Sequence, residues 1–127
     1  MRDGSAAAQF TRSLSEDVAG NSFGKVIAVG DVDEWKSQGH SFPGGAGVRF
    51  LSFSDLHEGT LALHRPDVIY SPVLARDFDC IELASLLHNI GFTGIYRAVG
   101  NDLPKPQVIE REVREMSRRL TFEIVKL

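Results

Sequence analysis

The sequence predicts a single α/β domain built on a parallel sheet of five strands. Short apolar runs alternate along the chain with amphipathic helical stretches, an order typical of βαβ units with right-handed crossovers. The runs are continuous instead of alternating, as in strands that are covered on both faces. A chain of 127 residues with a formal charge of −3 is large enough to fold without disulfides or a structural metal.

The chain begins with a segment unlike the rest. Residues 1–22 are mostly small and polar, and their larger apolar side chains recur at three- and four-residue steps, at Ala7, Phe10, Leu14 and Val18. This spacing predicts a marginal amphipathic helix that ends near Gly20. We therefore divide the chain into an N-terminal extension, residues 1–22, and an α/β domain, residues 23–127.

Five apolar runs within the domain are the predicted strands. The first is bounded by Gly30-Asp31 and the third follows Pro66. Five strands are a usual number for one sheet. The predicted strands are residues 25–29, 48–53, 67–71, 95–99 and 121–125.

Two short helices are expected in the first half of the domain. The first covers residues 33–38 and is followed by a glycine-rich stretch, residues 42–47, which we interpret as a turn because it lacks the Gly-Lys-Ser/Thr end of a phosphate-binding loop. The second covers residues 56–64, with Ser54 or Asp55 as its N-cap.

Two better-specified helices follow. Asp79 is a suitable cap for the third, and Gly91 can stop it in a left-handed conformation. The fourth starts at Pro106 and has an exposed side on which Glu110 faces Arg114. Each has one apolar stripe: Ile81, Leu83, Leu86, Leu87 and Ile90 in the third helix, and Ile109, Val113, Met116 and Leu120 in the fourth.

Composition excludes several classes of protein. The single cysteine, Cys80, cannot form a disulfide within the chain. No apolar run approaches the ~18 residues of a membrane span, and the N-terminus lacks the features of a signal peptide, so we expect a cytoplasmic protein without a membrane partner. The 14 basic residues are balanced by 17 acidic ones and are not clustered, which argues against binding of nucleic acid.

Acidic side chains follow the first two predicted strands. Asp31, Asp33 and Asp55 supply carboxylate oxygens from two neighbouring strand ends, a set that suits a weakly bound Mg²⁺. The alternative is that Asp33 and Asp55 cap the helices they precede, which leaves Asp31 without an explanation. No other cofactor is predicted.

The cysteine and the histidines give weaker signals. Cys80 begins the third predicted helix, where a helix N-terminus lowers the pKa of a thiol, but no second cysteine or histidine adjoins it in sequence, so we interpret it as a small packed side chain. The four histidines show no metal-ligand spacing and are expected to be solvated: His40, His57, His64 and His88.

A motif in residues 66–94 indicates a family. Pro66-Asp67 precedes the third strand, Asp79-Cys80-Ile81-Glu82-Leu83 begins the third helix, and Gly91-Phe92-Thr93-Gly94 follows it. This stretch resembles the centre of bacterial response-regulator receiver domains, the signalling modules of two-component systems. The resemblance implies a flavodoxin-like three-layer sandwich with strand order 2-1-3-4-5.

The receiver-like register departs from the family at the residues that carry its chemistry. Pro72 occupies the phosphoacceptor position, and proline has no nucleophilic side chain. The acidic pair after the first strand becomes Gly30-Asp31, and the Thr/Ser after the fourth strand becomes Gly100. Lys105-Pro106 resembles the family's Lys-Pro but follows Gly100 too closely to be equivalent.

The sequence therefore predicts a non-catalytic domain, incompetent in phosphorylation, that serves signalling or protein interaction. The alternative is a small α/β enzyme or ligand-binding protein. This alternative would use the carboxyl edge of the sheet, whose candidate residues are Asp31, Asp33, Ser54, Asp55, Pro72, Gly100 and Asn101.

We also expect a protein partner. Receiver domains continue into a final helix after their fifth strand, and no such helix follows residues 121–125 here, so we expect an apolar face to stay exposed. A homodimer or the N-terminal helix could cover it, and we favour the homodimer. The residues expected to interact are Phe10, Leu14, Phe122 and Ile124.

Overall fold

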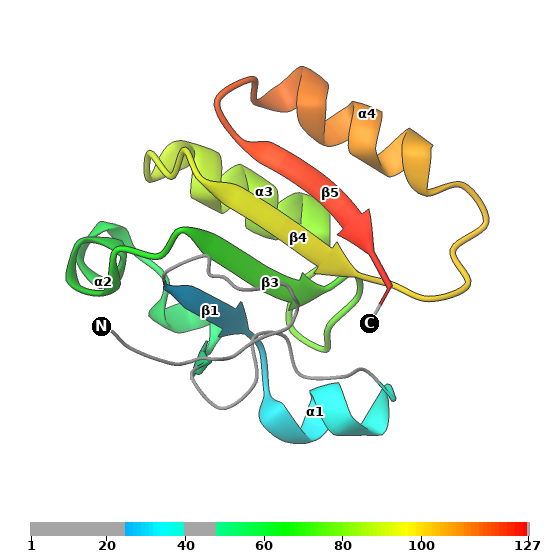
Figure 1. Cartoon of the computed structure of the whole chain (residues 1–127), viewed down its shortest axis with the longest axis horizontal. Coiled ribbons are helices and arrows are strands. Elements are labelled where there is room, and N and C mark those ends of the chain that lie inside the picture. Colours follow the sequence, from blue (N-terminus) through cyan, green and yellow to red (C-terminus); the bar gives the residue numbers. More distant parts are fainter. Residues whose placement is uncertain (1–24, 40–47, 127) are drawn as a thin grey trace.

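Five parallel strands form one sheet in the order β2-β1-β3-β4-β5 (Figure 1). The structure, a computed structural model, describes residues 25–39 and 48–126. The α/β class, the parallel sheet and the strand order confirm the prediction and are those of a flavodoxin-like fold. The predicted N-terminal helix and the glycine-rich stretch lie outside the described residues.

Each predicted strand is present, with small shifts at the ends. The second is shorter than expected, because the chain turns into a 3-10 helix, η2 (Phe53–Asp55), whose cap is the Ser52 side chain. The third extends one residue further and is buried along its whole length. The strands are β1 (Val26–Val29), β2 (Arg49–Leu51), β3 (Val68–Pro72), β4 (Ile95–Val99) and β5 (Thr121–Val125).

Four helices connect the strands: α1 (Val32–Ser37), α2 (Glu58–His64), α3 (Cys80–Asn89) and α4 (Pro106–Met116). The best-predicted is α3. The Asp79 carboxylate accepts from Glu82 N at 2.8 Å, the Glu82 carboxylate accepts from Asp79 N at 3.0 Å, and Gly91 has a φ of 87°. These local contacts confirm both predicted ends of the helix.

Two predicted helix boundaries are wrong. The cap expected at Ser54 or Asp55 is His57, whose Nδ1 accepts from Gly59 N at 3.0 Å, so α2 begins only at Glu58. The fourth helix ends at Met116 and does not reach Leu120. There Ser117 adopts an extended conformation, and Leu120 is buried in the connection that leads to β5.

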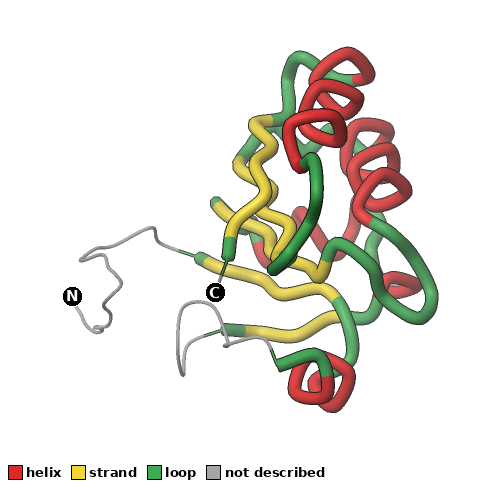
Figure 2. Tube along the Cα trace, turned by 90° about the vertical axis from the view of Figure 1, so that its right-hand side faces the viewer, coloured by secondary structure: helices red, strands yellow, loops and turns green. Residues whose placement is uncertain are grey.

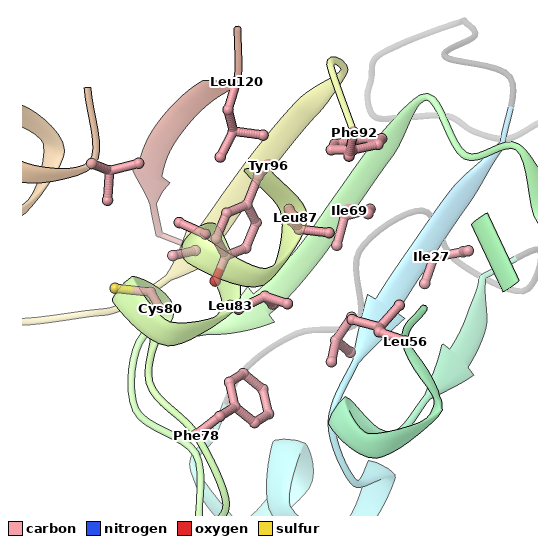
Figure 3. Close-up of a cluster of buried hydrophobic side chains, with 14 of the residues drawn as sticks. Ile27, Leu56, Ile69, Phe78, Cys80, Leu83, Leu87, Phe92, Tyr96 and Leu120 are labelled. Carbon is pink, nitrogen blue, oxygen red and sulfur yellow. The ribbon is translucent and has the colours of Figure 1, made fainter. Parts of the chain in front are cut away.

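The larger core fills the space between the sheet and the helices α2, α3 and α4. Ile69 and Tyr96 project from the sheet towards Leu83 and Leu87 of α3, and all four are fully buried (Figure 3). Val113 of α4 is buried in the same cluster. Figure 2 shows α3 and α4 along one side of the strands.

A second, smaller core lies on the opposite face of the sheet. Trp35 of α1 is fully buried there, among Ala28, Val68, Tyr70 and Val99. Among the described helices, α1 alone contributes to this cluster, so the two faces of the sheet are covered unequally by the part of the chain that the structure describes. None of the described helices is long and apolar enough to cross a membrane.

Candidate functional site at the carboxyl edge of the sheet

The carboxyl ends of β1 and β3 define the predicted site. The two strands are neighbours, and the order of the sheet reverses between them. In doubly wound folds, ligands bind in the crevice at this switch point. The side chains that line it therefore decide what the domain can bind.

Two apolar rings occupy the switch point. Gly30 has a φ of 133°, and a Cβ added there would lie 3.1 Å from Trp35 Nε1 and 3.7 Å from Pro72 Cδ. The Trp35 Nε1 donates to the Val29 carbonyl at 3.4 Å, which fixes the indole across the end of β1. Both Trp35 and Pro72 are fully buried. The switch point is therefore filled by two packed rings.

Proline is unusual in a central strand because it lacks an N–H. Pro72 is the last residue of β3, and the next amide, Val73 N, donates to the Val99 carbonyl at 2.9 Å. The sheet pairing is therefore resumed one residue beyond the proline.

Asp31, unexplained by sequence, is the N-cap of α1. Its Oδ1 accepts from Asp33 N at 2.7 Å and from Glu34 N at 3.3 Å. The interpretation of Asp33 and Asp55 as caps is wrong, since Asp31 caps α1 and His57 caps α2. Asp33 and Asp55 are exposed. Among the described residues, no group of three or more His, Cys, Asp or Glu side chains is arranged to hold a metal ion.

The end of β4 is tightly packed. A Cβ on Gly100 would lie 2.7 Å from Val73 Cγ2 and 2.8 Å from Leu103 Cδ1. The glycine therefore allows this close approach. Asn101 and Lys105 are exposed beyond it, as is Ser54 beyond β2.

The loop between β3 and α3 is tied to α1. The Glu34 carboxylate accepts from Arg76 N at 2.6 Å, and Gln38 Nε2 donates to the Leu74 carbonyl at 3.1 Å. Within the loop, Ala75 N donates to the Phe78 carbonyl at 2.9 Å. The carboxyl edge is therefore held together by contacts between its own elements.

A buried pair of hydroxyl groups, missed by sequence reasoning, lies behind the site. Ser71 Oγ donates to the Pro72 carbonyl at 2.8 Å and lies 2.6 Å from Tyr96 OH. Because Ser71 has one hydroxyl proton, the Tyr96 hydroxyl is the donor between the two. Burial raises the pKa of Tyr96 well above its ordinary value. The signal in sequence is faint, since both residues stand within otherwise apolar strands.

Cys80 does not have the lowered pKa that its position suggested. The thiol is buried, and this burial, with the nearby Asp79 carboxylate, raises its pKa to about 11, against the opposing effect of the backbone amides at the start of α3. The interpretation of Cys80 as a packed side chain agrees with its burial.

The expectation that the histidines are solvated holds only in part. His57 is exposed, although its ring also caps α2, whereas His64 and His88 are half-buried. The Nδ1 of His88 lies 2.8 Å from Oγ of the buried Ser117. His40 lies outside the described residues. No metal site was expected from their spacing.

A polar cluster lies on the face of the sheet that α1 partly covers. Arg97 Nε donates to Glu123 Oε1 at 2.8 Å, and Arg97 Nη1 donates to Tyr70 OH at 3.0 Å. Burial opposes the charge of the guanidinium, but Tyr70 and Glu123 together hold the pKa of Arg97 above its ordinary value. The cluster spans the three strands β3, β4 and β5.

Two of the predicted interaction residues, Phe122 and Ile124, lie on the opposite face of the sheet from the Arg97 cluster. Phe122 and Ile124 pack against the larger core, on the side of α3 and α4, and the Phe122 ring lies 5.1 Å from the Tyr96 ring. Phe10 and Leu14 lie outside the described residues. A hollow of about 440 Å³ lies at the opposite, amino edge, between α2 and the start of β3, with Glu58, Arg65 and Asp67 in its lining.

Comparisons of the chain with protein families, curated proteins and solved structures give no match. The fold is identified from the parallel sheet and its strand order alone.

Proposed function

We propose that this chain is a non-catalytic, receiver-like interaction domain that does not accept a phosphoryl group. The observation that supports this most directly is the filling of the switch point by Pro72 and Trp35, both fully buried. Proline supplies neither a nucleophile nor a hydrogen-bond donor, and the indole N–H of Trp35 is donated to the Val29 carbonyl.

Aspartyl phosphorylation needs a carboxylate nucleophile and a divalent cation that neutralises the incoming oxygens. In the receiver-like register, Asp31 is the one acid that remains beside β1. Its Oδ1 already accepts two backbone amides of α1, so binding a cation through that oxygen would compete with the cap. Capping of α1 is therefore a sufficient structural role for Asp31.

Incubation with acetyl phosphate and Mg²⁺, followed by intact-mass spectrometry, tests this part of the proposal. We expect an unchanged mass, with a phosphorylation-competent receiver domain as the positive control for the reagent. A stable gain of one phosphoryl group on an aspartate would overturn it.

The interaction surface that we propose is the α1-side face, the part of the sheet face beside α1 over β3, β4 and β5. It combines half-buried apolar side chains, Ile95 and Val125, with the Arg97–Glu123 pair. The Glu123 side chain is 43% exposed and that of Arg97 is 20% exposed. Sheets of this class are covered on both faces, so this surface suits a partner that is apolar and carries both charges.

A second copy of the chain meets these requirements. A two-fold axis through the α1-side face would bring the same apolar side chains together and place Arg97 of each copy near Glu123 of the other. The proposed partner is therefore another molecule of this protein.

Sedimentation velocity of the wild type and two variants tests the partner. Val125→Arg places a charge in the α1-side face and should shift the wild-type dimer towards monomer. Leu63→Arg is the matched control, because Leu63 is 73% exposed on α2, on the other side of the sheet, and should leave the dimer unchanged. A wild type that stays monomeric at millimolar concentration would refute the second copy as partner.

A further inference from the structure

The outer edge of β5 pairs with no other strand of the described part of the chain. β5 is the last strand of the sheet. Thr121 N donates to the Gly94 carbonyl and Gly100 N donates to the Val125 carbonyl, so the polar groups of Thr121 and Val125 point towards β4. Because backbone groups alternate in direction along a strand, those of Phe122 and Ile124 point away from the sheet.

One of these outward groups is occupied by a side chain from α4. Glu110 Oε2 accepts from Ile124 N at 3.0 Å in a partly buried environment, and α4 packs along β5 (Figure 1). Glu110 was expected on the exposed side of its helix, facing Arg114. Instead its carboxylate binds the edge of the strand.

The sequence of this edge makes the contact significant. Residues 120–125, Leu-Thr-Phe-Glu-Ile-Val, are β-branched, aromatic or apolar except for one acid. Segments of this composition on an open edge pair readily with other strands, and proteins protect such edges with charged side chains or covering helices. The opposite edge strand, β2, has only three residues.

We propose that the outer edge of β5 is a pairing surface for β5 of a second copy, and that Glu110 keeps it closed. An antiparallel pair centred on Glu123 would set Phe122 of each copy opposite Ile124 of the other, so that their outward N–H and C=O groups bond reciprocally. The two Glu123 side chains at the centre are each already paired with Arg97. With Glu110 in place, the Ile124 N–H is not available as a donor.

This inference concerns a different surface from the α1-side face and does not depend on the proposed function. The expected change is therefore measured relative to the wild type, whatever its own oligomeric state. Two readouts apply: amide hydrogen exchange at Ile124, and mass by sedimentation over a concentration series.

Glu110→Ala should speed exchange of the Ile124 amide by about tenfold at low concentration, because a charge-assisted hydrogen bond is lost. At high concentration it should raise the mean mass above that of the wild type. Glu110→Asp retains the charge but shortens the side chain by one methylene, and it should behave like Glu110→Ala. Glu110→Gln retains an acceptor of the same length without the charge, so both of its effects should be smaller than those of Glu110→Ala.

Glu115→Ala is the matched control, since it removes one exposed acid from the same helix and should change neither readout. Circular dichroism confirms that each variant is folded. If Glu110→Ala and Glu110→Asp keep the wild-type mass at every concentration, or if Glu115→Ala raises the mass equally, the inference is overturned.

Discussion

The Ser71–Tyr96 pair allows the energetics of the buried interior to be tested by two deletions of unequal cost. Ser71 has two partners, because it donates to the Pro72 carbonyl and accepts from Tyr96 OH. Among the residues that the structure describes, Ser71 is the one hydrogen-bond partner of Tyr96 OH, and both side chains are fully buried. Removing either hydroxyl breaks the hydrogen bond between Ser71 and Tyr96. Only the removal of the Ser71 hydroxyl leaves the other hydroxyl, that of Tyr96, without a partner.

Ser71→Ala leaves the Tyr96 hydroxyl buried without a partner, which should lower the free energy of unfolding by about 1–3 kcal/mol. Tyr96→Phe leaves Ser71 still bonded to the Pro72 carbonyl, so its cost should be that of one ordinary hydrogen bond, about 0.5–1.5 kcal/mol. In the double variant no hydroxyl is left without a partner, but the Pro72 carbonyl loses its side-chain donor, as it does in Ser71→Ala. The cost of the double variant should therefore exceed that of Tyr96→Phe by about one hydrogen bond and still be less than the sum of the two single variants.

Urea unfolding followed by circular dichroism measures all four proteins, with equal m-values as the condition for comparison. The quantity that tests the assignment is the difference between the costs of Ser71→Ala and Tyr96→Phe in free energy of unfolding. If Tyr96→Phe costs more than Ser71→Ala, or if the two costs add in the double variant, the assignment of Tyr96 as the donor with a single partner is wrong.

Two further predictions concern Cys80 and Gly100. Because the pKa of Cys80 is raised from 9.0 to about 11, the unfolded chain loses the thiol proton first, and the free energy of unfolding should fall as pH rises through this interval. Urea titrations at several pH values should show a steeper alkaline decline in the wild type than in Cys80→Ala, and equal declines would contradict the raised pKa. Gly100→Ala should cost about 1–3 kcal/mol by overpacking, since its Cβ would lie 2.7 Å from Val73 Cγ2. Adding Leu103→Ala should recover part of that cost, and simple additivity in denaturant melts would exclude the clash.

The parts of the fold that could be predicted are those specified by neighbouring residues. Asp79 and Glu82 cap the start of α3 within one turn, and Gly91 follows its end with a positive φ. Both boundaries of the helix could therefore be predicted from neighbouring residues in the sequence. The five apolar runs determine the strands in the same way. A histidine N-cap such as His57 has no comparable signal, and for that reason the start of α2 was missed.

The candidate site was harder to predict because it depends on contacts between distant residues. Sequence placed Asp31, Pro72 and Gly100 at one edge, but nothing local shows that Trp35 packs beside Gly30 and Pro72 at the ends of β1 and β3. The same holds for Glu110, whose partner Ile124 belongs to the next strand. Cys80 was misjudged in its pKa because burial outweighs the helix N-terminus, and burial is a property of the packed structure.

Trp35 also gives the molecule a built-in optical reporter. It is the single tryptophan of the chain, and α1 has only six residues, too few to form a stable helix without the cap and the ties to the neighbouring loop. Its fluorescence therefore follows the closure of the switch point, whereas circular dichroism follows the whole sheet and its helices. An emission change that precedes loss of the dichroism signal would mean that α1 detaches while the rest of the domain stays folded.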